Sequence, residues 1–337
     1  MTELPRPLKE CGVHDDCTMS FLKIAGLFAL LCAMLMFGQA AKNGSGANHE
    51  ESQTLPGLRV DVDLVLVHAT VTDSSNKYVT NLSLEDFRVW EDKIEQQLQY
   101  LSTENVPLSV GVIFDVSGSM QNKLTAARAA ANTFLRMGDR DDEYFLVEFS
   151  NSPRLVQDFT TDITKLQSQL LFTRAKGNTS LYDALYLGLE KVSQGSNTRK
   201  ALLLITDGED NHSRYGFSDV KQFAREHDVM IYSIGIVQGV DQQFSGLGGK
   251  LVLESLAELT GGVAFFPDSL DALSEICERI GTDLKNQYVL GYRPMNPSND
   301  GSWRKVQVRI NTPKGMAPLH VRARSGYYAP AIAKVAK

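Results

Sequence analysis

The sequence predicts an α/β fold: a doubly wound, mostly parallel sheet that is inserted in, or flanked by, a small antiparallel β-sandwich. Between Pro107 and about Gly281, apolar runs of strand length alternate with segments of helical periodicity, as in a parallel sheet with crossover helices. Short strand patterns occur before this segment and again after it. The chain has 337 residues, which is enough for two hydrophobic cores.

The elements of the parallel sheet follow from apolar runs and from helical spacing. The apolar runs predict strands at residues 109–114, 144–149, 201–206, 229–236 and 263–266. Apolar residues at helical spacing predict helices over residues 120–137, 162–171, 181–193, 217–227, 250–260 and 269–286. Residues 154–159 follow the second strand after only a short turn, which favours an antiparallel strand at the edge of the sheet.

The flanking β segments are each too small to be stable alone. Strand patterns at 59–73, 87–90 and 97–101 precede the α/β segment, and patterns at 287–293, 304–310 and 320–328 follow it. We therefore expect the strands of 58–105 to pair with those of 284–330, the latter forming an antiparallel meander, in one sandwich around an α/β domain at 106–283. Two separate small domains are the alternative.

The amino-terminal part of the chain predicts export. Residues 21–37 are almost continuously apolar apart from Lys23, and the small residues Gly38 and Ala40 that follow match a cleavage site. A signal peptide within residues 1–41, cleaved near Ala40, accounts for this pattern, and an uncleaved single-span anchor is the alternative. Residues 42–57 are polar and predict a flexible tether. The expected location is periplasmic, secreted or on the cell surface, with membrane contact only if the segment is uncleaved.

The net charge bears on possible partners, and the cysteine content bears on possible disulfides. The formal net charge is −6 and no cluster of Lys and Arg occurs, so nucleic-acid binding has little support. Cleavage near Ala40 would leave Cys277 without a partner cysteine. Since Cys277 lies on an amphipathic helix pattern, we expect a buried structural thiol.

A polar loop follows the first predicted strand of the parallel sheet. Asp115, Ser117 and Ser119 lie between the strand at 109–114 and the helix at 120–137. Open α/β sheets bind ligands at this position, the carboxyl end of a strand. The alternate spacing lets all three side chains turn toward one point, and oxygen ligands of this kind suit Mg²⁺, Mn²⁺ or Ca²⁺.

Two further loops contribute oxygens to the same edge of the predicted sheet. Thr179 precedes the helix at 181–193, and Asp207 follows the strand at 201–206. A serine such as Ser119 can also cap a helix without any metal. That reading does not explain why three loops supply matching oxygens, and a metal site is the better interpretation.

These residues resemble a known family. Asp115-Val116-Ser117-Gly118-Ser119, with Thr179 and Asp207, is similar to the metal-ion-dependent adhesion site of von Willebrand factor A domains, over residues 107–281. The resemblance implies a Rossmann-like fold and a metal held by the hydroxyls of Ser117, Ser119 and Thr179. Asp115 and Asp207 would hold it directly or through water. The flanking segments resemble the exported VWFA-related proteins of acidobacteria.

The charge of such a site favours the binding of a ligand over catalysis. Hydroxyl and carboxylate ligands leave one position on the metal that a Glu or Asp of a partner protein can fill. Asn178, Glu209 and His212 are candidates for the rim of that ligand site. We expect a non-enzymatic protein of adhesion, scaffolding or envelope assembly. One alternative is a structural envelope protein with a stabilising metal. A Mg²⁺-dependent phosphohydrolase is less favoured, because it would require an acidic residue at the position of Ser117.

Overall fold

The fold is described from a computed structural model, which covers residues 64–208, 210–236 and 246–331. These residues belong to one compact unit, Val60–Lys337. The predicted signal segment at 1–41 and the tether at 42–57 lie outside the described residues. Among the helices described, none combines the length and the apolar character that a membrane crossing requires.

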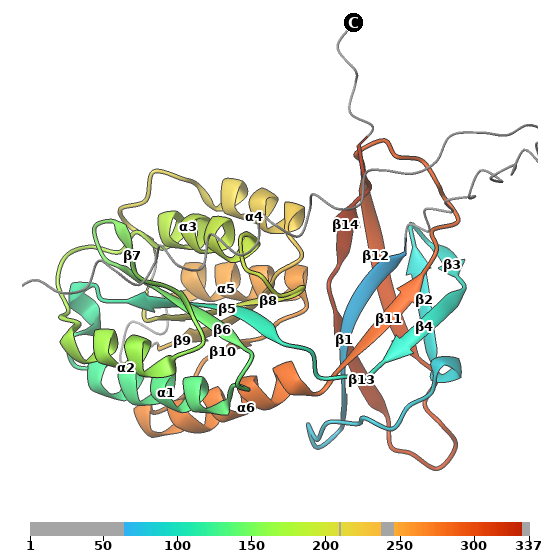
Figure 1. The fold of residues 1–337 in the computed structure, drawn as a ribbon, viewed down its shortest axis with the longest axis horizontal. Coiled ribbons are helices and arrows are strands. Elements are labelled where there is room, and N and C mark those ends of the chain that lie inside the picture. The colour runs from blue at the N-terminus through green and yellow to red at the C-terminus, as the bar shows by residue number, and fades with distance from the viewer. Residues whose placement is uncertain (1–63, 209, 237–245, 332–337) are drawn as a thin grey trace, which may run out of the picture. The chain divides into compact units, whose positions relative to one another are not determined.

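A six-stranded sheet forms the centre of the α/β part, in the order β10-β9-β8-β5-β6-β7 (Figure 1). Its neighbouring strands are parallel except for β7, which pairs antiparallel with β6 at one edge. The strands are β5 (Leu108–Asp115), β6 (Glu143–Phe149), β7 (Pro153–Thr160), β8 (Arg199–Thr206), β9 (Met230–Gly235) and β10 (Ala264–Phe265). The predicted α/β fold class is therefore confirmed.

Helices cover both faces of this sheet, as a doubly wound fold requires (Figure 1). One apolar core joins the sheet to α1 (Leu124–Met137), α2 (Ile163–Phe172) and α6 (Leu273–Lys285). A second core joins the other face to α3 (Leu181–Ser193), α4 (Phe217–Glu226) and α5 (Gly246–Thr260). Cys277 is buried in the first core, and burial raises the pKa of its thiol to about 12, so it packs as an inert side chain.

Strand β5 is the central strand that carries the first polar loop. All eight of its residues are buried, because helices cover it on both sides and β6 and β8 flank it. A short 3₁₀ turn, Gly118–Met120, follows the strand, so α1 begins at Leu124 and not at residue 120 as predicted. The loop from Asp115 to Lys123 is thus longer than the sequence pattern suggested.

Two antiparallel sheets contain the strands that flank the α/β part. One has the order β13-β1-β11-β4 and the other β14-β12-β2-β3. The strands are β1 (Val65–Asp73), β2 (Phe87–Glu91), β3 (Ile94–Gln96), β4 (Leu98–Ser102), β11 (Gln287–Tyr292), β12 (Trp303–Ile310), β13 (Leu319–Ala323) and β14 (Gly326–Tyr328), with a 3₁₀ turn at Leu84–Asp86. Each sheet combines strands from before and after the α/β part, and a shared apolar core fills the space between them.

The predicted C-terminal meander is wrong. Strands β11 and β12 lie in different sheets, and the single strand predicted at 320–328 is divided into β13 and β14, which also lie in different sheets. The chain changes sheet at Arg324 and Ser325, where the Ser325 amide donates a 3.0 Å hydrogen bond to the Leu259 carbonyl. Contacts with the α/β part therefore divide a run that reads as one strand.

The strand β3 was also missed by the sequence patterns. It forms a tight hairpin with β2, and the connecting residues Asp92 and Lys93 have φ values of 46° and 73°. Two consecutive residues of positive φ give the turn whose twist matches a two-residue hairpin. Neither residue is glycine, so the usual signal for this turn was absent.

Candidate functional site

Asp115, the last residue of β5, is fully buried and is held by two donors. Its Oδ1 accepts a 2.7 Å hydrogen bond from the Ser117 amide, and its Oδ2 accepts a 2.6 Å hydrogen bond from the Thr206 hydroxyl. Thr206 ends the neighbouring strand β8. The carboxylate is thus fixed between the carboxyl ends of two parallel strands, with lone pairs left for further partners.

A chain of polar contacts joins the first loop to the loop after β8. The Ser117 and Ser119 hydroxyl oxygens lie 3.0 Å apart, and the Ser119 hydroxyl donates a 2.8 Å hydrogen bond to Oδ1 of Asp207. The Asp207 side chain is only 1% exposed. The structure therefore brings Asp115, Ser117, Ser119 and Asp207 to one edge of the sheet.

Thr179 reaches the same edge from the loop before α3. Its hydroxyl oxygen lies 3.9 Å from the point where a Cβ on Gly208 would stand, directly beside Asp207. Asn211 makes two hydrogen bonds to the Thr179 backbone. Its side chain accepts one from the Thr179 amide at 2.9 Å, and its amide donates one to the Thr179 carbonyl at 3.0 Å. Thr179 is thus tied to the loop that carries Asp207.

Backbone contacts also tie the Thr179 loop to the loop after β5. The Gly118 amide donates to the Gly177 carbonyl at 2.9 Å, and the Lys176 amide donates to the Val116 carbonyl at 2.8 Å. Gly177 has a φ of 82°, and a Cβ there would stand 2.7 Å from Oδ1 of Asn151. The positive φ and the close approach of Asn151, in the turn between β6 and β7, therefore require glycine at this position.

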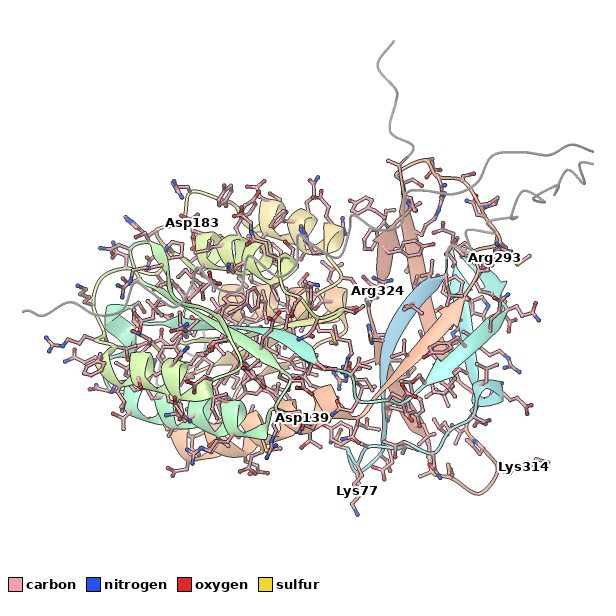
Figure 2. The ribbon with its side chains drawn as sticks, in the orientation of Figure 1. Lys77, Asp139, Asp183, Arg293, Lys314 and Arg324 are labelled. Atoms are coloured by element: carbon pink, nitrogen blue, oxygen red, sulfur yellow. The ribbon has the colours of Figure 1, made fainter. Side chains whose placement is uncertain are left out.

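Asp183, near the start of α3 (Figure 2), fastens the far end of the Asp207 loop. Its Oδ1 accepts hydrogen bonds from the amides of Arg214 at 2.9 Å and Tyr215 at 3.1 Å, and Oδ2 accepts from Nε of Arg214 at 3.3 Å. Asp210 acts in the same way on the other side, since its Oδ1 accepts from the Tyr182 amide at 3.3 Å. The loop after β8 is thus held against the first turn of α3.

The predicted rim residues lie around this cluster with different exposures. Asn178 is exposed, and its amide donates to Oδ1 of Asn151 at 2.7 Å. His212 is exposed, and its amide donates to the Thr179 carbonyl at 3.1 Å. Glu209 lies outside the described residues. Asn178 and His212 are accessible beside the cluster, and their rim role stays a prediction.

Lys123 is a part of the cluster that the sequence patterns did not identify. Its Nζ lies 2.7 Å from Oδ2 of Asp207, and its side chain is 15% exposed. Lys123 is the N-cap residue of α1, whose first turn contains no acidic residue. A cation at this end of a helix is unfavourable without a nearby anion. That mismatch is the sequence signal that could have indicated an acidic partner.

Burial changes the protonation of the cluster. It raises the pKa of the Asp115 carboxyl to about 6, and nearby Asp207 raises it as well, against the hydrogen bonds from Thr206 and Ser117 that lower it. Nearby positive charge favours the ionised form of such a carboxyl. A cation bound beside Asp115 and Asp207 would therefore stabilise their ionised forms.

The donor set fits a hard divalent cation. Carboxylate and hydroxyl oxygens from three loops converge, and Ser117 and Thr179 are buried. Among the described residues, no group of three or more His, Cys, Asp or Glu could hold a metal ion. Zinc and similar metals prefer nitrogen and sulfur ligands, whereas Mg²⁺ takes one or two carboxylates and completes its shell with neutral oxygens. The residues present thus fit Mg²⁺, Mn²⁺ or Ca²⁺.

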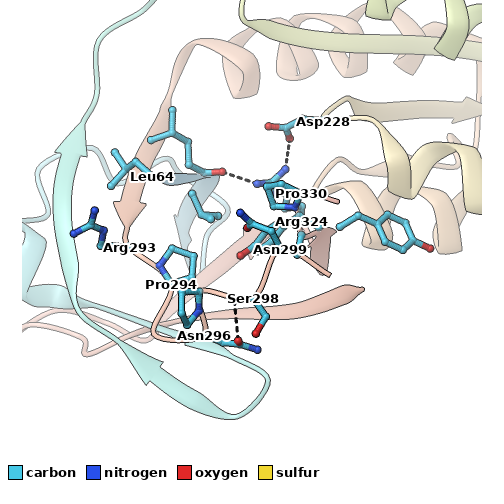
Figure 3. Close-up of a pocket in the computed structure, with 15 residues that line it drawn as sticks. Leu64, Asp228, Arg293, Pro294, Asn296, Ser298, Asn299, Arg324 and Pro330 are labelled. Carbon is cyan, nitrogen blue, oxygen red and sulfur yellow. Dashed lines mark hydrogen bonds and ion pairs between the residues drawn. The ribbon is translucent and has the colours of Figure 1, made fainter. Parts of the chain in front are cut away.

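A cavity lies elsewhere in the described part of the chain, and no predicted site residue lines it. It has a volume of about 880 Å³ and lies between the start of β1, the loop after β11 and the end of the described chain (Figure 3). The Arg324 guanidinium within it is already engaged, by Asp228 at 2.8 Å and by the Leu66 carbonyl at 2.8 Å.

The fold is a doubly wound sheet with polar loops at the carboxyl ends of its central strands, the place where open α/β sheets generally bind ligands. Residues 110–209 match the family model described as von Willebrand factor type A domain. This part of the chain is therefore a von Willebrand factor type A (VWA) domain, and the resemblance predicted from Asp115, Thr179 and Asp207 is confirmed at the level of the domain.

Similar proteins were found among curated sequences and among solved structures. Calcium-activated chloride channel regulator 3A-1 of Mus musculus is 27% identical over 188 residues, covering 51% of this chain and 19% of the regulator. Calcium-activated chloride channel regulator 1 of Bos taurus is 27% identical over 191 residues, with the same coverage, 51% and 19%. The chain thus spans about a fifth of the length of the curated relatives that it matches.

Two solved structures are among those to which the chain is similar. The von Willebrand factor type A protein from Catenulispora acidiphila has a TM-score of 0.47 and 12% identity, covering 81% of this chain and 74% of that one. The vWF domain of the type V pili tip protein Mfa5 from Porphyromonas gingivalis has a TM-score of 0.43 and 15% identity, covering 53% and 95%.

Proposed function

We propose that this VWA domain holds a divalent cation, Mg²⁺ or alternatively Mn²⁺ or Ca²⁺, and uses it to bind an acidic side chain of a partner protein. The observation that carries the proposal is the contact chain from Ser117 through Ser119 to Asp207, beside the buried Asp115. Ser117, Ser119 and Thr179 would hold the cation through their hydroxyls. Asp115 and Asp207 would hold it directly or through water.

The cation, when bound, would supply an electrophilic position that a carboxylate oxygen of the partner can fill. The chain's own residues prepare that position. Thr206 and the Ser117 amide fix the Asp115 carboxylate, and Asn211 fixes the Thr179 backbone. Because these groups are held before any ligand arrives, little ordering remains to be done on binding.

The cellular role that we propose is adhesion, scaffolding or envelope assembly by an exported protein. The predicted signal segment within residues 1–41 supports export, with cleavage near Ala40. The two antiparallel sheets, one with β1 and β11 and the other with β2 and β12, would present the α/β domain to its partner. The partner is a protein that offers a Glu or Asp.

The second candidate is a structural role in which a metal only stabilises the three loops. The loops of Gly118 and Gly177 contact each other through backbone hydrogen bonds, and a metal that bridges them would add to this contact. The two functions differ in their response to a chelator. A stabilising metal changes the melting temperature and leaves partner binding unaffected, whereas a binding metal changes partner binding.

We further propose that the protein is not an enzyme. A phosphohydrolase would want an acid at position 117 as well as Asp115, and Ser117 instead offers a buried hydroxyl that contacts Ser119. Phosphatase activity with Mg²⁺ that is lost in Asp115→Asn would overturn this part of the proposal.

The experiment compares capture of proteins from an envelope extract of the source organism by the purified chain. The arms contain Mg²⁺, a chelator, the variant Asp115→Ala, or the milder variant Ser119→Ala at an exposed position. Asp271→Ala, an exposed acid of the 3₁₀ turn Leu270–Ala272, is the matched control. We expect the same captured protein with Mg²⁺ and with Asp271→Ala and none in the other arms. Capture that persists undiminished in chelator contradicts the proposal.

A further inference from the structure

Lys123 and Asp207 form an ion pair inside the candidate metal site. The Nζ of Lys123 lies 2.7 Å from Oδ2 of Asp207, and their side chains are 15% and 1% exposed. The pair is therefore shielded from most of the solvent, where charges interact more strongly than at an open surface. A cation would approach a carboxylate that already has a positive partner.

The position of Lys123 makes this pairing specific. It stands at the N-cap of α1, where the helix dipole repels a cation, and it has no acidic neighbour in the first turn. The negative charge that balances the Lys123 ammonium is that of Asp207, 84 residues further along the chain. A lysine at this helix end thus depends on the metal loop for its counter-charge.

The charges around the site can be counted from these contacts. Among the described residues, the polar groups that contact the carboxylates of Asp115 and Asp207 are those of Ser117, Thr206, Ser119 and Lys123. Lys123 is the only cation in that set. Two carboxylates and one ammonium leave the site with a formal charge of −1, and a divalent cation would change that to +1.

We propose that Lys123 weakens the intrinsic affinity of the site for a divalent cation and makes that affinity depend on a carboxylate ligand. This inference rests on the proposed function and extends it by naming the residue that sets the preference for an acidic partner. With Lys123 present, the loaded site carries an uncompensated positive charge, which an incoming carboxylate neutralises. Without Lys123, the site with its cation is already neutral, and a carboxylate ligand increases the affinity for the cation only slightly.

The coupling is reciprocal, as any linkage between two bound ligands must be. A carboxylate that tightens cation binding is itself held more tightly when the cation is present, by the same factor. Lys123 therefore makes the cation and the acidic ligand bind together, and neither is expected to bind tightly alone.

The test measures Mn²⁺ binding to the purified chain by titration calorimetry, without and with acetate as the carboxylate probe. For the unmodified chain we expect acetate to tighten Mn²⁺ binding by about fivefold or more, the lower range of measured couplings. Lys123→Met, which keeps the length of the side chain, should tighten Mn²⁺ binding about tenfold without acetate and reduce the acetate effect to less than about twofold.

Three further variants make the outcome decisive. Lys123→Gln removes the charge but can still donate to Asp207, so it should behave as Lys123→Met does, and it serves if the Met variant does not fold. Lys123→Arg should behave as the unmodified chain does. Lys165→Met removes an exposed lysine of α2 that has no ion pair among the described residues, and it should leave both quantities unchanged.

The failure of this inference and the failure of the proposed function are distinguishable. If Mn²⁺ binds the unmodified chain but Lys123→Met and Lys123→Gln bind it equally or more weakly, Lys123 supports the site and the inference is wrong, while the metal site stands. If acetate has no effect on the unmodified chain, the inference is also wrong. If millimolar Mn²⁺ binds none of the variants, the proposed function is wrong and the inference falls with it.

Discussion

The hydroxyl of Thr206 donates a 2.6 Å hydrogen bond to Oδ2 of Asp115 and so joins the carboxyl ends of strands β8 and β5. The two residues are 91 positions apart in the sequence, and both are fully buried. The contact fixes the carboxylate at the centre of the candidate site. It also makes Thr206, which supplies no ligand itself, a support for the three loops.

Replacing Thr206 by valine tests this support. The variant keeps the shape of the side chain but leaves a buried carboxylate oxygen and the Gly208 amide without this partner. We expect a loss of about 1–3 kcal/mol in the free energy of unfolding, measured by urea titration. Thr282→Val removes an exposed hydroxyl that contacts the Glu278 carbonyl, and should cost less than about 0.5 kcal/mol. Equal losses in the two variants would show that the Thr206–Asp115 hydrogen bond does not contribute to the free energy of unfolding.

Asp183 is predicted to control metal affinity without contacting the metal. Asp183→Ala removes the acceptor for the amides of Arg214 and Tyr215 and should release the loop that carries Asp207. Supporting residues of metal sites typically contribute 10- to 100-fold to affinity, and we expect Mn²⁺ binding to weaken by about tenfold. Asp271→Ala is the control. Unchanged Mn²⁺ affinity in a folded Asp183→Ala variant would refute the prediction.

Gly177 and Gly315 form a matched pair for testing the approach of the Thr179 loop. Both have positive φ, 82° and 89°, but a Cβ on Gly177 would meet Asn151 at 2.7 Å, whereas a Cβ on Gly315 has no neighbour within 4 Å. Each alanine variant should lose about 1 kcal/mol through backbone strain. Gly177→Ala should lose more and should also weaken Mn²⁺ binding. The prediction is wrong if the two variants behave alike.

We predict that His68 in β1 makes the free energy of unfolding depend on pH. Burial lowers the pKa of His68 from 6.5 to about 4; Asp228 raises it, while Arg199 and Arg324 lower it further. Below pH 6.5 the unfolded chain binds a proton that the folded chain does not, so stability is full above pH 6.5 and declines as the pH falls toward 4. The expected loss over that range is on the order of 2–3 kcal/mol.

Melting temperatures from pH 4.5 to 8 measure this dependence. His68→Gln should reduce the decline, whereas His320→Gln, at an exposed position, should retain it. A decline of the same size in both variants would mean that other groups cause it.

The sequence predicted the parts of the site that depend on strand ends. Asp115 and Asp207 each follow a strongly apolar run, and parallel strands end at the same sheet edge, so their meeting followed from the fold class. Thr179 was placed with them because a helix pattern begins directly after it. The metal-binding role of these residues stays a prediction, as do the domain boundaries, export and the acidobacterial resemblance.

The supporting contacts could not be predicted in the same way. Thr206, Asn211 and Lys123 act through partners 91, 32 and 84 residues away, and the identity of such a partner depends on which strands are neighbours. The division of β13 from β14 was missed for a similar reason. Its cause is a hydrogen bond from Ser325 to Leu259 in another part of the fold, which leaves no trace in the local pattern.

The central claim is that one divalent cation binds where the loops of Ser117, Thr179 and Asp207 meet. Mn²⁺ titration of the purified chain, followed by electron paramagnetic resonance, tests it most directly. We predict one Mn²⁺ per chain, displaced by Mg²⁺, and a loss of affinity of about 100-fold or more in Ser117→Ala and in Asp207→Asn, since residues that only support a metal site already contribute up to about 100-fold. Mn²⁺ binding of the same stoichiometry and affinity in the unmodified chain and in both variants would contradict the claim.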